Sequence, residues 1–431
     1  MSVGQRVCFN LNYGTIRYSG GLAGKTGTWL GIEWDDPTRG RGDGSVDGTR
    51  YFTCSSPTGA SFLRSNAPSL KLGRTFVEAL KDKYIEDAHD ESVMESILLG
   101  SSNGIEVEAV NMNKVRGKFA RLDTLKEVGM EGYLISSAGP PGEIQKTSPA
   151  IRRLELSRNL LSDWNDVVEI VQQLPVLESL TLHYNILRPL SSVLTGQCRS
   201  VTELLLGRTH TTWEQSLLIA PAFPSLKHLE LGYNDISYLS TVNLKDGGQK
   251  PPSLATLTLD GNQIADWTAL AQSLKPILQS LLLSENNLAR VTAPTSLDLQ
   301  LLSITTLVID GNAVSEWSSI DAISAWLPNL SSLRVTDTPL LTETAKYAKQ
   351  ILIGRVGSLR RVNGTEVTEQ TRKDCEIFYL SWIMKNSKPD ERVALHPRWH
   401  ELTQIYGTPA EEKPAADTTR LEGRLIGTQK T

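Results

Sequence analysis

Regularly spaced leucines over the middle of this 431-residue chain limit its fold more than any other feature. The template L-x-x-L-x-L-x-x-N, with Leu or Ile at the apolar positions, occurs in strong form six times, ending at Asn159, Asn185, Asn234, Asn262, Asn286 and Asn312. Weaker copies are centred on Val128, Leu204 and Leu333, so successive centres lie 24 to 28 residues apart. A unit of this length cannot bury its apolar face alone, and it becomes stable when neighbours stack on it. The sequence therefore predicts a solenoid.

The template is that of leucine-rich repeats, and we expect an α/β solenoid over residues 105–358 with inward leucines and a backbone-bonding asparagine at each turn. Convex segments such as residues 166–174 and 318–327 are predicted as helices. Because side chains alternate across a strand, the residues that flank the buried leucines face the concave side. We interpret this mixed, slightly acidic face, with three exposed apolar side chains, as a protein-docking surface. Its members are Glu155, Thr181, His183, Glu203, Leu205, His228, Glu230, Thr258, Asp260, Leu282, Val308, Asp310 and Arg334.

Metal and disulfide sites are not expected. His183 and His228 share the concave face, but no third ligand is in register with them. The four cysteines, at positions 8, 54, 198 and 375, are far apart and form no C-x-x-C pair. This spacing argues against a zinc site and a disulfide framework, so we expect reduced, mostly buried thiols.

Composition is that of an ordinary globular protein, with 39% hydrophobic and 21% charged residues. No apolar run approaches the roughly 20 residues of a membrane helix, and the N-terminus lacks an apolar signal core, so we expect a cytoplasmic protein without a membrane partner. The net charge is +4 over residues 1–75 and −8 over the remainder. A basic head favours an acidic partner, but no nucleic-acid-binding motif accompanies it, and nucleic acid is not expected.

The head, residues 1–75, is predicted to be a small β barrel or sandwich with strands near residues 5–9, 15–18, 30–34 and 51–54. Trp29, Trp34 and Phe52 lie among glycines at positions 27, 31, 40, 42 and 44. Glycine permits positive φ and close approach of a ligand backbone, while aromatic rings supply contact area. The pattern indicates a peptide-binding groove. For Trp34, whose neighbours alternate as in a strand, a core position is the alternative.

This head resembles a CAP-Gly domain, the glycine-rich module of microtubule-associated proteins. The resemblance rests on G-T-W-L-G-I from position 27, an acidic turn ending at Pro37, G-R-G-D-G-S from position 40, G-T-R-Y-F from position 48 and F-L-R from position 62. It implies a groove for acidic C-terminal tails that end in Glu-Glu-Tyr or Glu-Glu-Phe, such as that of α-tubulin. Gly42 stands where the family has Asn, so one side-chain contact is missing. The candidate peptide-binding residues are Trp29, Trp34, Gly40, Arg41, Gly42, Asp43, Gly44, Ser45, Arg50, Phe52 and Arg64.

Catalysis is not expected. The sequence S-G-G-L-A-G-K-T from position 19 is one residue short of a phosphate loop, and a strand rather than a helix should follow it. No H-E-x-x-H motif occurs in the sequence. We therefore predict a non-enzymatic protein that needs no cofactor.

Three further segments complete the predicted organisation. Residues 76–104 should form a helical linker with a solvated charged face, and an edge strand at 105–110 should open the solenoid. Residues 359–386 are predicted as a helical C-terminal cap, which an open repeat core requires. Residues 387–431, with four prolines, are predicted as linker and tail.

The combination of this head with leucine-rich repeats resembles the tubulin-folding cofactor E family. Local matches are E-W-D-D-P-T-R-G from position 33, I-R-R-L-E-L-S-R-N from position 151 and I-Y-G-T-P-A-E from position 405. The resemblance implies assembly or disassembly of the α/β-tubulin heterodimer in the cytoplasm and cytoskeleton, with the α-tubulin tail in the head groove and the tubulin body on the solenoid. It also implies cofactor D with β-tubulin, cofactors B and C as partners, and a ubiquitin-like domain whose truncated first strand would be residues 424–428.

A microtubule-end adaptor is the alternative function. Such an adaptor would hold the polymer through coiled coils or basic linkers, and this chain has neither a heptad array nor a basic linker. The sequence therefore favours the tubulin cofactor.

Overall fold

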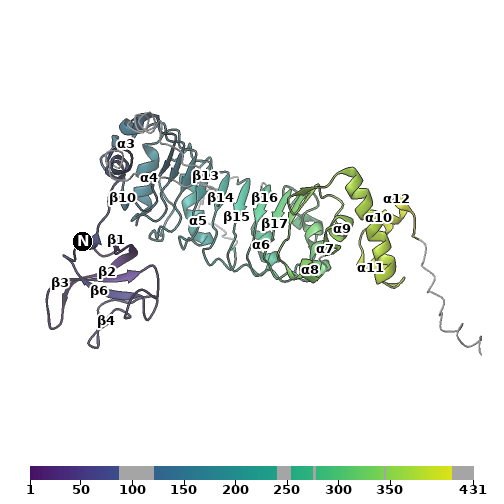
Figure 1. Cartoon of the computed structure of the whole chain (residues 1–431), viewed down its shortest axis with the longest axis horizontal. Coiled ribbons are helices and arrows are strands. Elements are labelled where there is room, and N and C mark those ends of the chain that lie inside the picture. The colour runs from purple at the N-terminus through teal and green to yellow at the C-terminus, as the bar shows by residue number, and fades with distance from the viewer. Residues whose placement is uncertain (87–120, 240–253, 275–277, 344–345, 410–431) are drawn as a thin grey trace, which may run out of the picture. The chain divides into compact units, whose positions relative to one another are not determined.

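The computed structural model describes residues 1–86, 121–239, 254–274, 278–343 and 346–409 (Figure 1). The chain divides into two compact units, Met1–Asn287 and Leu288–Thr431. The strands expected at residues 105–110 and 424–428 lie outside the described residues.

The head is an antiparallel five-stranded sheet with strand order β6-β3-β2-β1-β7. Its apolar residues meet in a core of Val7, Ile16, Leu30, Ile32 and Trp34. Lys25 starts a strand, so no phosphate-loop helix follows it, as expected. The bounds are β1 (Arg6–Phe9), β2 (Asn12–Leu22), β3 (Lys25–Trp34), β4 (Ser45–Val46), β5 (Thr49–Arg50), β6 (Ala60–Arg64) and β7 (Leu70–Lys71).

One strand prediction in the head is wrong. Residues 51–54 form no strand, because the amides of Tyr51 and Phe52 both donate to the carbonyl of Gly44. The edge position beside β3 is taken by β6, in which Arg64 pairs with Trp29. Residues 62–64 belong to the CAP-Gly motif, but no strand was predicted for them.

The segment after the head is a helix, as predicted, but residues 76–86 are not a free linker. Strand β8 (Arg74–Thr75) pairs in parallel with β10 (Ile135–Ser137), and α1 (Phe76–Lys81) contacts both β10 and α3 (Glu143–Thr147). The Thr75 side chain caps α1, which continues as a π-helical turn, Asp82–Glu86. Phe76 and Leu80 are fully buried. This helix therefore packs on the first repeat and covers its apolar end.

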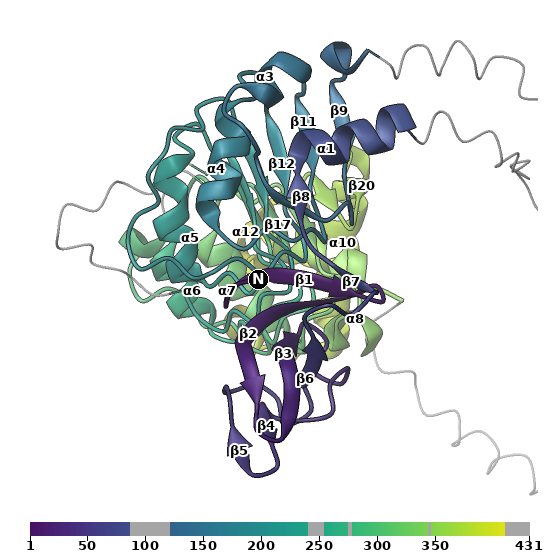
Figure 2. The same cartoon turned by 90° about the vertical axis from the view of Figure 1, so that its left-hand side faces the viewer.

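In the first unit, the repeats form parallel strands that lie side by side (Figures 1 and 2). Neighbouring strands pair in one register, with the central apolar residues opposite each other. The predicted solenoid is thus confirmed. The strands are β9 (Glu127–Gly129), β11 (Arg153–Glu155), β12 (Ser179–Thr181), β13 (Glu203–Leu205), β14 (His228–Glu230), β15 (Thr256–Thr258) and β16 (Ser280–Leu282).

Helices connect these strands on the convex side. Each of the three longer ones begins with a buried tryptophan directly after a capping side chain, at Asp163, Thr212 and Asp266. The capping oxygen accepts backbone N–H groups that have no partner within the helix. The helices are α4 (Trp164–Gln172), α5 (Trp213–Ile219) and α6 (Trp267–Ser273), with 3₁₀ turns at Leu122–Thr124 and Ala220–Ala222.

Buried asparagines join consecutive repeats, as predicted. The Asn185 Nδ2 group donates to the carbonyls of Leu182 (3.1 Å) and of Leu156 in the preceding repeat (2.8 Å). Its Oδ1 accepts the backbone N–H of Asn159 at 3.0 Å. One side chain therefore satisfies backbone groups of two neighbouring repeats.

The second unit continues the repeat with parallel strands and ends in a β-hairpin and a helical cap. The predicted cap helix is α10. The strands are β17 (Thr306–Val308), β18 (Ser332–Arg334), β19 (Arg361–Val362) and β20 (Thr365–Glu366). The helices are α7 (Trp317–Trp326), α8 (Pro339–Glu343), α9 (Ala348–Arg355), α10 (Glu369–Asn386), α11 (Arg392–Leu395) and α12 (Trp399–Tyr406), with a 3₁₀ turn at Leu297–Leu299.

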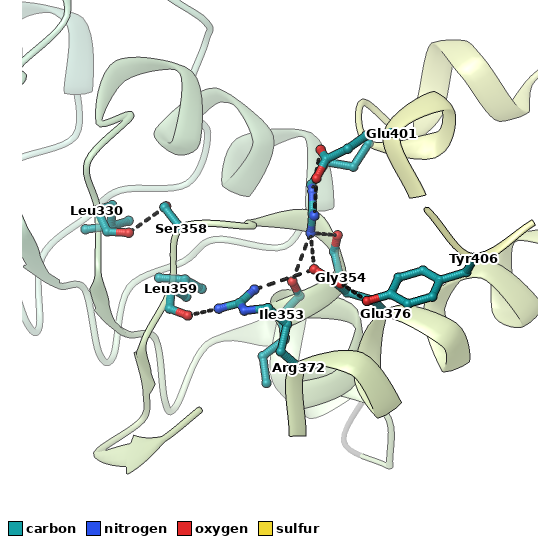
Figure 3. Close-up of polar contacts among 10 residues, drawn as sticks. Leu330, Ile353, Gly354, Ser358, Leu359, Arg372, Glu376, Glu401 and Tyr406 are labelled. Carbon is teal, nitrogen blue, oxygen red and sulfur yellow. Dashed lines mark hydrogen bonds and ion pairs between the residues drawn. The ribbon is translucent and has the colours of Figure 1, made fainter. Parts of the chain in front are cut away.

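The prediction of a linker from residue 387 is wrong for the described residues up to 409. Leu402 is fully buried against Tyr379 and Ile383 of α10. Figure 3 shows the polar contacts that hold this region. The Arg398 guanidinium donates to Glu376 Oε1 at 2.9 Å and to the carbonyl of Gly354 at 2.9 Å. Residues 387–406 are therefore part of the folded cap.

Candidate peptide-binding site

Trp29 lies at the centre of a basic and aromatic face on the head. Arg64, its partner across the β3–β6 pair, lies 5.0 Å from the centre of the indole ring, and Lys25 lies 5.4 Å from it. The indole N–H donates to the carbonyl of Thr26 at 3.2 Å, which fixes the ring. A cation over an indole face is attracted by the ring quadrupole. The face therefore offers an aromatic platform bordered by positive charge.

Phe52 adds a second ring, and two glycines make room for it. A Cβ at Gly31 would lie 2.4 Å from the Phe52 ring, and one at Gly44 would lie 2.2 Å from the Phe52 carbonyl. Gly44 also has a φ of +93°, which favours glycine. The Phe52 ring is 5.5 Å from that of Phe62. The spacing of glycines and aromatic residues in the sequence is thus explained by packing.

The loop behind Phe52 is fixed by Glu33 on β3. The Glu33 carboxylate accepts the backbone N–H of Ser55 at 2.8 Å and its hydroxyl at 2.7 Å, and it pairs with Arg17 at 2.7 Å. Burial raises the pKa of this carboxyl, but the bonds from Ser55 and Arg17 outweigh burial and bring the pKa to about 2. Glu33 therefore remains charged near neutral pH and holds the loop.

The loop at residues 40–45 contributes the other predicted contacts. Asp43 accepts the Ser45 amide at 3.1 Å and pairs with Arg50 at 2.7 Å, and these bonds lower its pKa. Arg41 and Arg64 are exposed and contact no carboxylate among the described residues. Arg41 and Arg64 can therefore donate hydrogen bonds to the carboxylates of an acidic ligand, whereas Arg50 already has a carboxylate partner.

Trp34 was wrongly included among the peptide-binding residues. Its side chain is 3% exposed and belongs to the head core, and its indole N–H donates to Ser61 at 2.9 Å. The strand alternation around it, which was the alternative interpretation, was the better signal.

Gly42 has room for the side chain that the family pattern places there. A Cβ at Gly42 would meet no atom within 4 Å, and the backbone does not have a positive φ. We predict that Gly42→Asn folds normally and binds a peptide ending in Glu-Glu-Tyr about two- to tenfold more tightly, as one added hydrogen bond allows. Peptide titration measures the effect. Gly44→Asn is the control and should destabilise the head; unchanged or weaker binding by Gly42→Asn contradicts the prediction.

The predicted concave face has fewer free acidic groups than the sequence suggested. In the first unit, Glu155 accepts the amide of Ser157 at 2.6 Å, and Asp260 accepts the amide of Ser284 in the next repeat at 2.6 Å. In the second unit, Asp310 pairs with Arg334 at 2.7 Å and accepts the amide of Thr336. These carboxylates therefore bind their own chain, which no repeat spacing reveals.

Two predicted docking residues of the second unit are buried. Val308 and Asp310 are each 9% exposed, so neither offers much surface to a partner. Leu205 and Leu282 are partly exposed and His228 is exposed in the first unit, as expected.

A polar cluster lies at the middle of the first unit's concave face. His183 Nδ1 accepts the amide of Gly207 at 2.9 Å, and its Nε2 lies 4.0 Å from Glu230. Burial raises the pKa of Glu230; His183 opposes that shift, while Asp260 and Glu203 add to it.

Among the described residues, no group of three or more His, Cys, Asp and Glu side chains could hold a metal ion. No described helix is both long and apolar enough to cross a membrane.

Known proteins match both the head alone and nearly the whole chain. Residues 3–67 match the family model of the CAP-Gly domain. The chain is similar to "Tubulin-specific chaperone E" of Pongo abelii, with 33% identity over 98% of this chain and 83% of the relative. It is similar to "Tubulin-folding cofactor E" of Arabidopsis thaliana, with 30% identity over 96% of this chain and 80% of the relative.

Solved structures show partial similarity. The Bik1 CAP-Gly domain with an ETF peptide from Bim1 is 28% identical over 15% of this chain and 77% of that chain, with a TM-score of 0.14. Internalin C2 of Listeria monocytogenes is 23% identical over 51% of this chain and 82% of that chain, with a TM-score of 0.31.

Proposed function

This chain belongs to the family of tubulin-specific chaperone E, and from that membership we propose that it is a non-enzymatic tubulin-folding cofactor. It binds α-tubulin and takes part in assembly or disassembly of the α/β-tubulin heterodimer. The observation that carries this proposal is similarity along nearly the whole chain to relatives named for tubulin folding.

The head captures the acidic, aromatic-ended tail of α-tubulin. Trp29 and Phe52 give the terminal ring a surface to pack on, and Arg41 and Arg64 bind carboxylates through paired, charge-assisted hydrogen bonds. The +4 charge of residues 1–75 attracts an acidic tail over a longer range.

The solenoid holds the tubulin body. Leu205, His228 and Glu230 of the first unit leave surface for this contact, while the carboxylates bonded to backbone amides keep the repeats in place. Cofactor D, carrying β-tubulin, and cofactors B and C act with it in the cytoplasm. GTP hydrolysis belongs to tubulin, so this chain needs no nucleotide site of its own.

Substitutions on the head test the tail contact. We predict that Trp29→Ala weakens binding of an α-tubulin tail peptide about tenfold or more by loss of packing, and that Arg41→Glu weakens it by charge reversal. Each variant is titrated against the peptide with and without its last aromatic residue. Lys71→Glu, which makes the same charge change at an exposed residue of β7, is the control. Unchanged affinity in both variants would refute the assignment of this face.

A different measurement distinguishes the tubulin cofactor from the alternative function, a microtubule-end adaptor. Purified protein is mixed with polymerised microtubules or with free heterodimer, and the complexes are separated by sedimentation and by size. We expect a complex with the heterodimer and release of separated subunits. Lasting co-sedimentation with polymer, without a heterodimer complex, contradicts the cofactor proposal.

A further inference from the structure

An alternating ladder of arginine and tyrosine lies on one edge of the solenoid in the first unit. Its members occupy the same position in consecutive repeats, directly before the turn asparagine or its replacement Thr209, and all have positive φ, from 52° to 59°. They are Arg158, Tyr184, Arg208 and Tyr233. A left-handed backbone at one site of every repeat aims these side chains in a common direction.

The side chains of the ladder stack on one another. Arg158 lies 4.3 Å from the centre of the Tyr184 ring, and Arg208 lies 5.7 Å from Tyr184 and 4.5 Å from Tyr233. The Tyr233 hydroxyl donates to Glu285 at 2.9 Å. The ring also covers Gly261, where a Cβ would lie 2.2 Å away. The ladder is therefore pre-ordered, which lowers the entropy cost of binding to it.

A cavity of about 500 Å³ separates the ladder from the head, within the same unit. The head side includes Tyr13, Asp35 and Arg39, and the largely buried Trp34 adds little surface to it. The volume of the cavity falls in the range of small-ligand and short-peptide sites. The cavity thus has aromatic and cationic walls on both sides.

The three acidic groups of this cavity are hydrogen-bonded or ion-paired, and Asp235 among them accepts the Gln263 side-chain amide at 3.1 Å. Two of the cations are not in contact with a carboxylate. Asp35 forms an ion pair with the buried Arg6, and Asp36 accepts both the amide and the hydroxyl of Thr38. Arg208 stacks on tyrosines and Arg39 lies 4.8 Å from the Trp34 ring, and neither contacts a carboxylate in the described parts of the chain.

We propose that this cavity binds a short acidic peptide segment of a partner protein, whose carboxylates bond to Arg39 and Arg208 and whose chain packs on the tyrosines. Guanidinium groups bind carboxylates in paired geometry, and stacking on rings keeps them planar and oriented. A long polyanion such as nucleic acid is disfavoured, because a cavity of about 500 Å³ has room only for a short segment.

This site is separate from the proposed tail-binding face. Trp29 and Trp34 lie five residues apart on β3, which corresponds to about 16 Å along the strand. The proposal does not depend on the tubulin assignment, and the two can be tested apart.

The test uses the full chain carrying Trp29→Ala and Arg64→Glu, which removes the ring and the cation paired with it on the tail-binding face. A fluorescent, C-terminally amidated hexaglutamate peptide is titrated by anisotropy. We expect binding in this background and about tenfold weaker binding after Arg208→Glu or Arg39→Glu, as loss of a charge-assisted bond implies. Arg208→Gln should give a smaller loss, and Arg290→Glu, an exposed site in the other unit, should give none.

Three results overturn the proposal. The first is absence of hexaglutamate binding in the background variant, and the second is an affinity of the Arg208 and Arg39 variants that equals that of the background variant. The third is tighter binding of a single-stranded oligonucleotide than of hexaglutamate at the same site. A cooperative thermal unfolding transition, measured for each variant, checks that the variant is folded. Failure here leaves the tail-peptide result for Trp29→Ala unaffected, so the two proposals fail separately.

Discussion

Replacing Asn262 by alanine is expected to lower the free energy of unfolding by about 3 kcal/mol or more, because several buried backbone groups lose their partners. Asn262 is 5% exposed. Its Oδ1 accepts the amides of Asn234 and Ile236, each at 3.0 Å. Its Nδ2 donates to the carbonyls of Leu231 and Leu259, each at 2.9 Å. Chemical denaturation of the purified variant measures the loss.

The chain offers matched controls for this experiment. Asn262→Thr copies the natural repeat in which Thr209 donates to the carbonyl of Leu206 at 2.7 Å, so it should keep one bond and lose less stability. Asn165→Ala removes an exposed asparagine whose amide bonds to Asp163, and it should change stability by less than about 0.5 kcal/mol. A loss of unfolding free energy below about 1 kcal/mol for Asn262→Ala would show that the buried asparagines are dispensable for stability.

Arg398→Ala is expected to destabilise the C-terminal cap by about 3 to 5 kcal/mol, because it leaves the Glu376 carboxylate buried without its main cation. The Glu376 side chain is 4% exposed. Arg398 also bonds to Glu401 and the carbonyl of Gly354, while Tyr406 donates to Glu376 at 2.8 Å. Denaturation combined with limited proteolysis should show earlier release of residues 387–409.

Two variants separate the charge effect from loss of packing. Combining Arg398→Ala with Glu376→Gln should cost less than Arg398→Ala alone, since no charge is then left buried. Lys388→Ala removes an exposed ion pair to Glu391 at 3.8 Å and should cost less than about 1 kcal/mol. Equal protease resistance of Arg398→Ala and the parent would mean that α11 and α12 do not depend on this network.

Periodic features were predictable from the sequence because buried and exposed side chains alternate with the period of the repeat and of its strands and helices. The leucine spacing locates every described solenoid strand from β9 to β18, and the helix expected at residues 318–327 is α7, Trp317–Trp326. Helix α11 has four residues and α12 has eight. Such short helices show little periodicity, and their prolines suggested a linker. Their burial depends on Arg398 and Leu402 meeting partners far away in the chain.

The candidate site also has features that the sequence predicted and features that it did not. The sequence by itself determined the repeat register, the glycines that admit Phe52 and the basic character of the head, because these depend on local spacing and composition. The tertiary structure alone decided that Trp34 is core, that Asp260 binds the next repeat, and that Arg208 stacks between two tyrosines. The physical reason is that side-chain partners from distant parts of the chain, not residue type, decide whether a ring or a charge is free to bind a ligand.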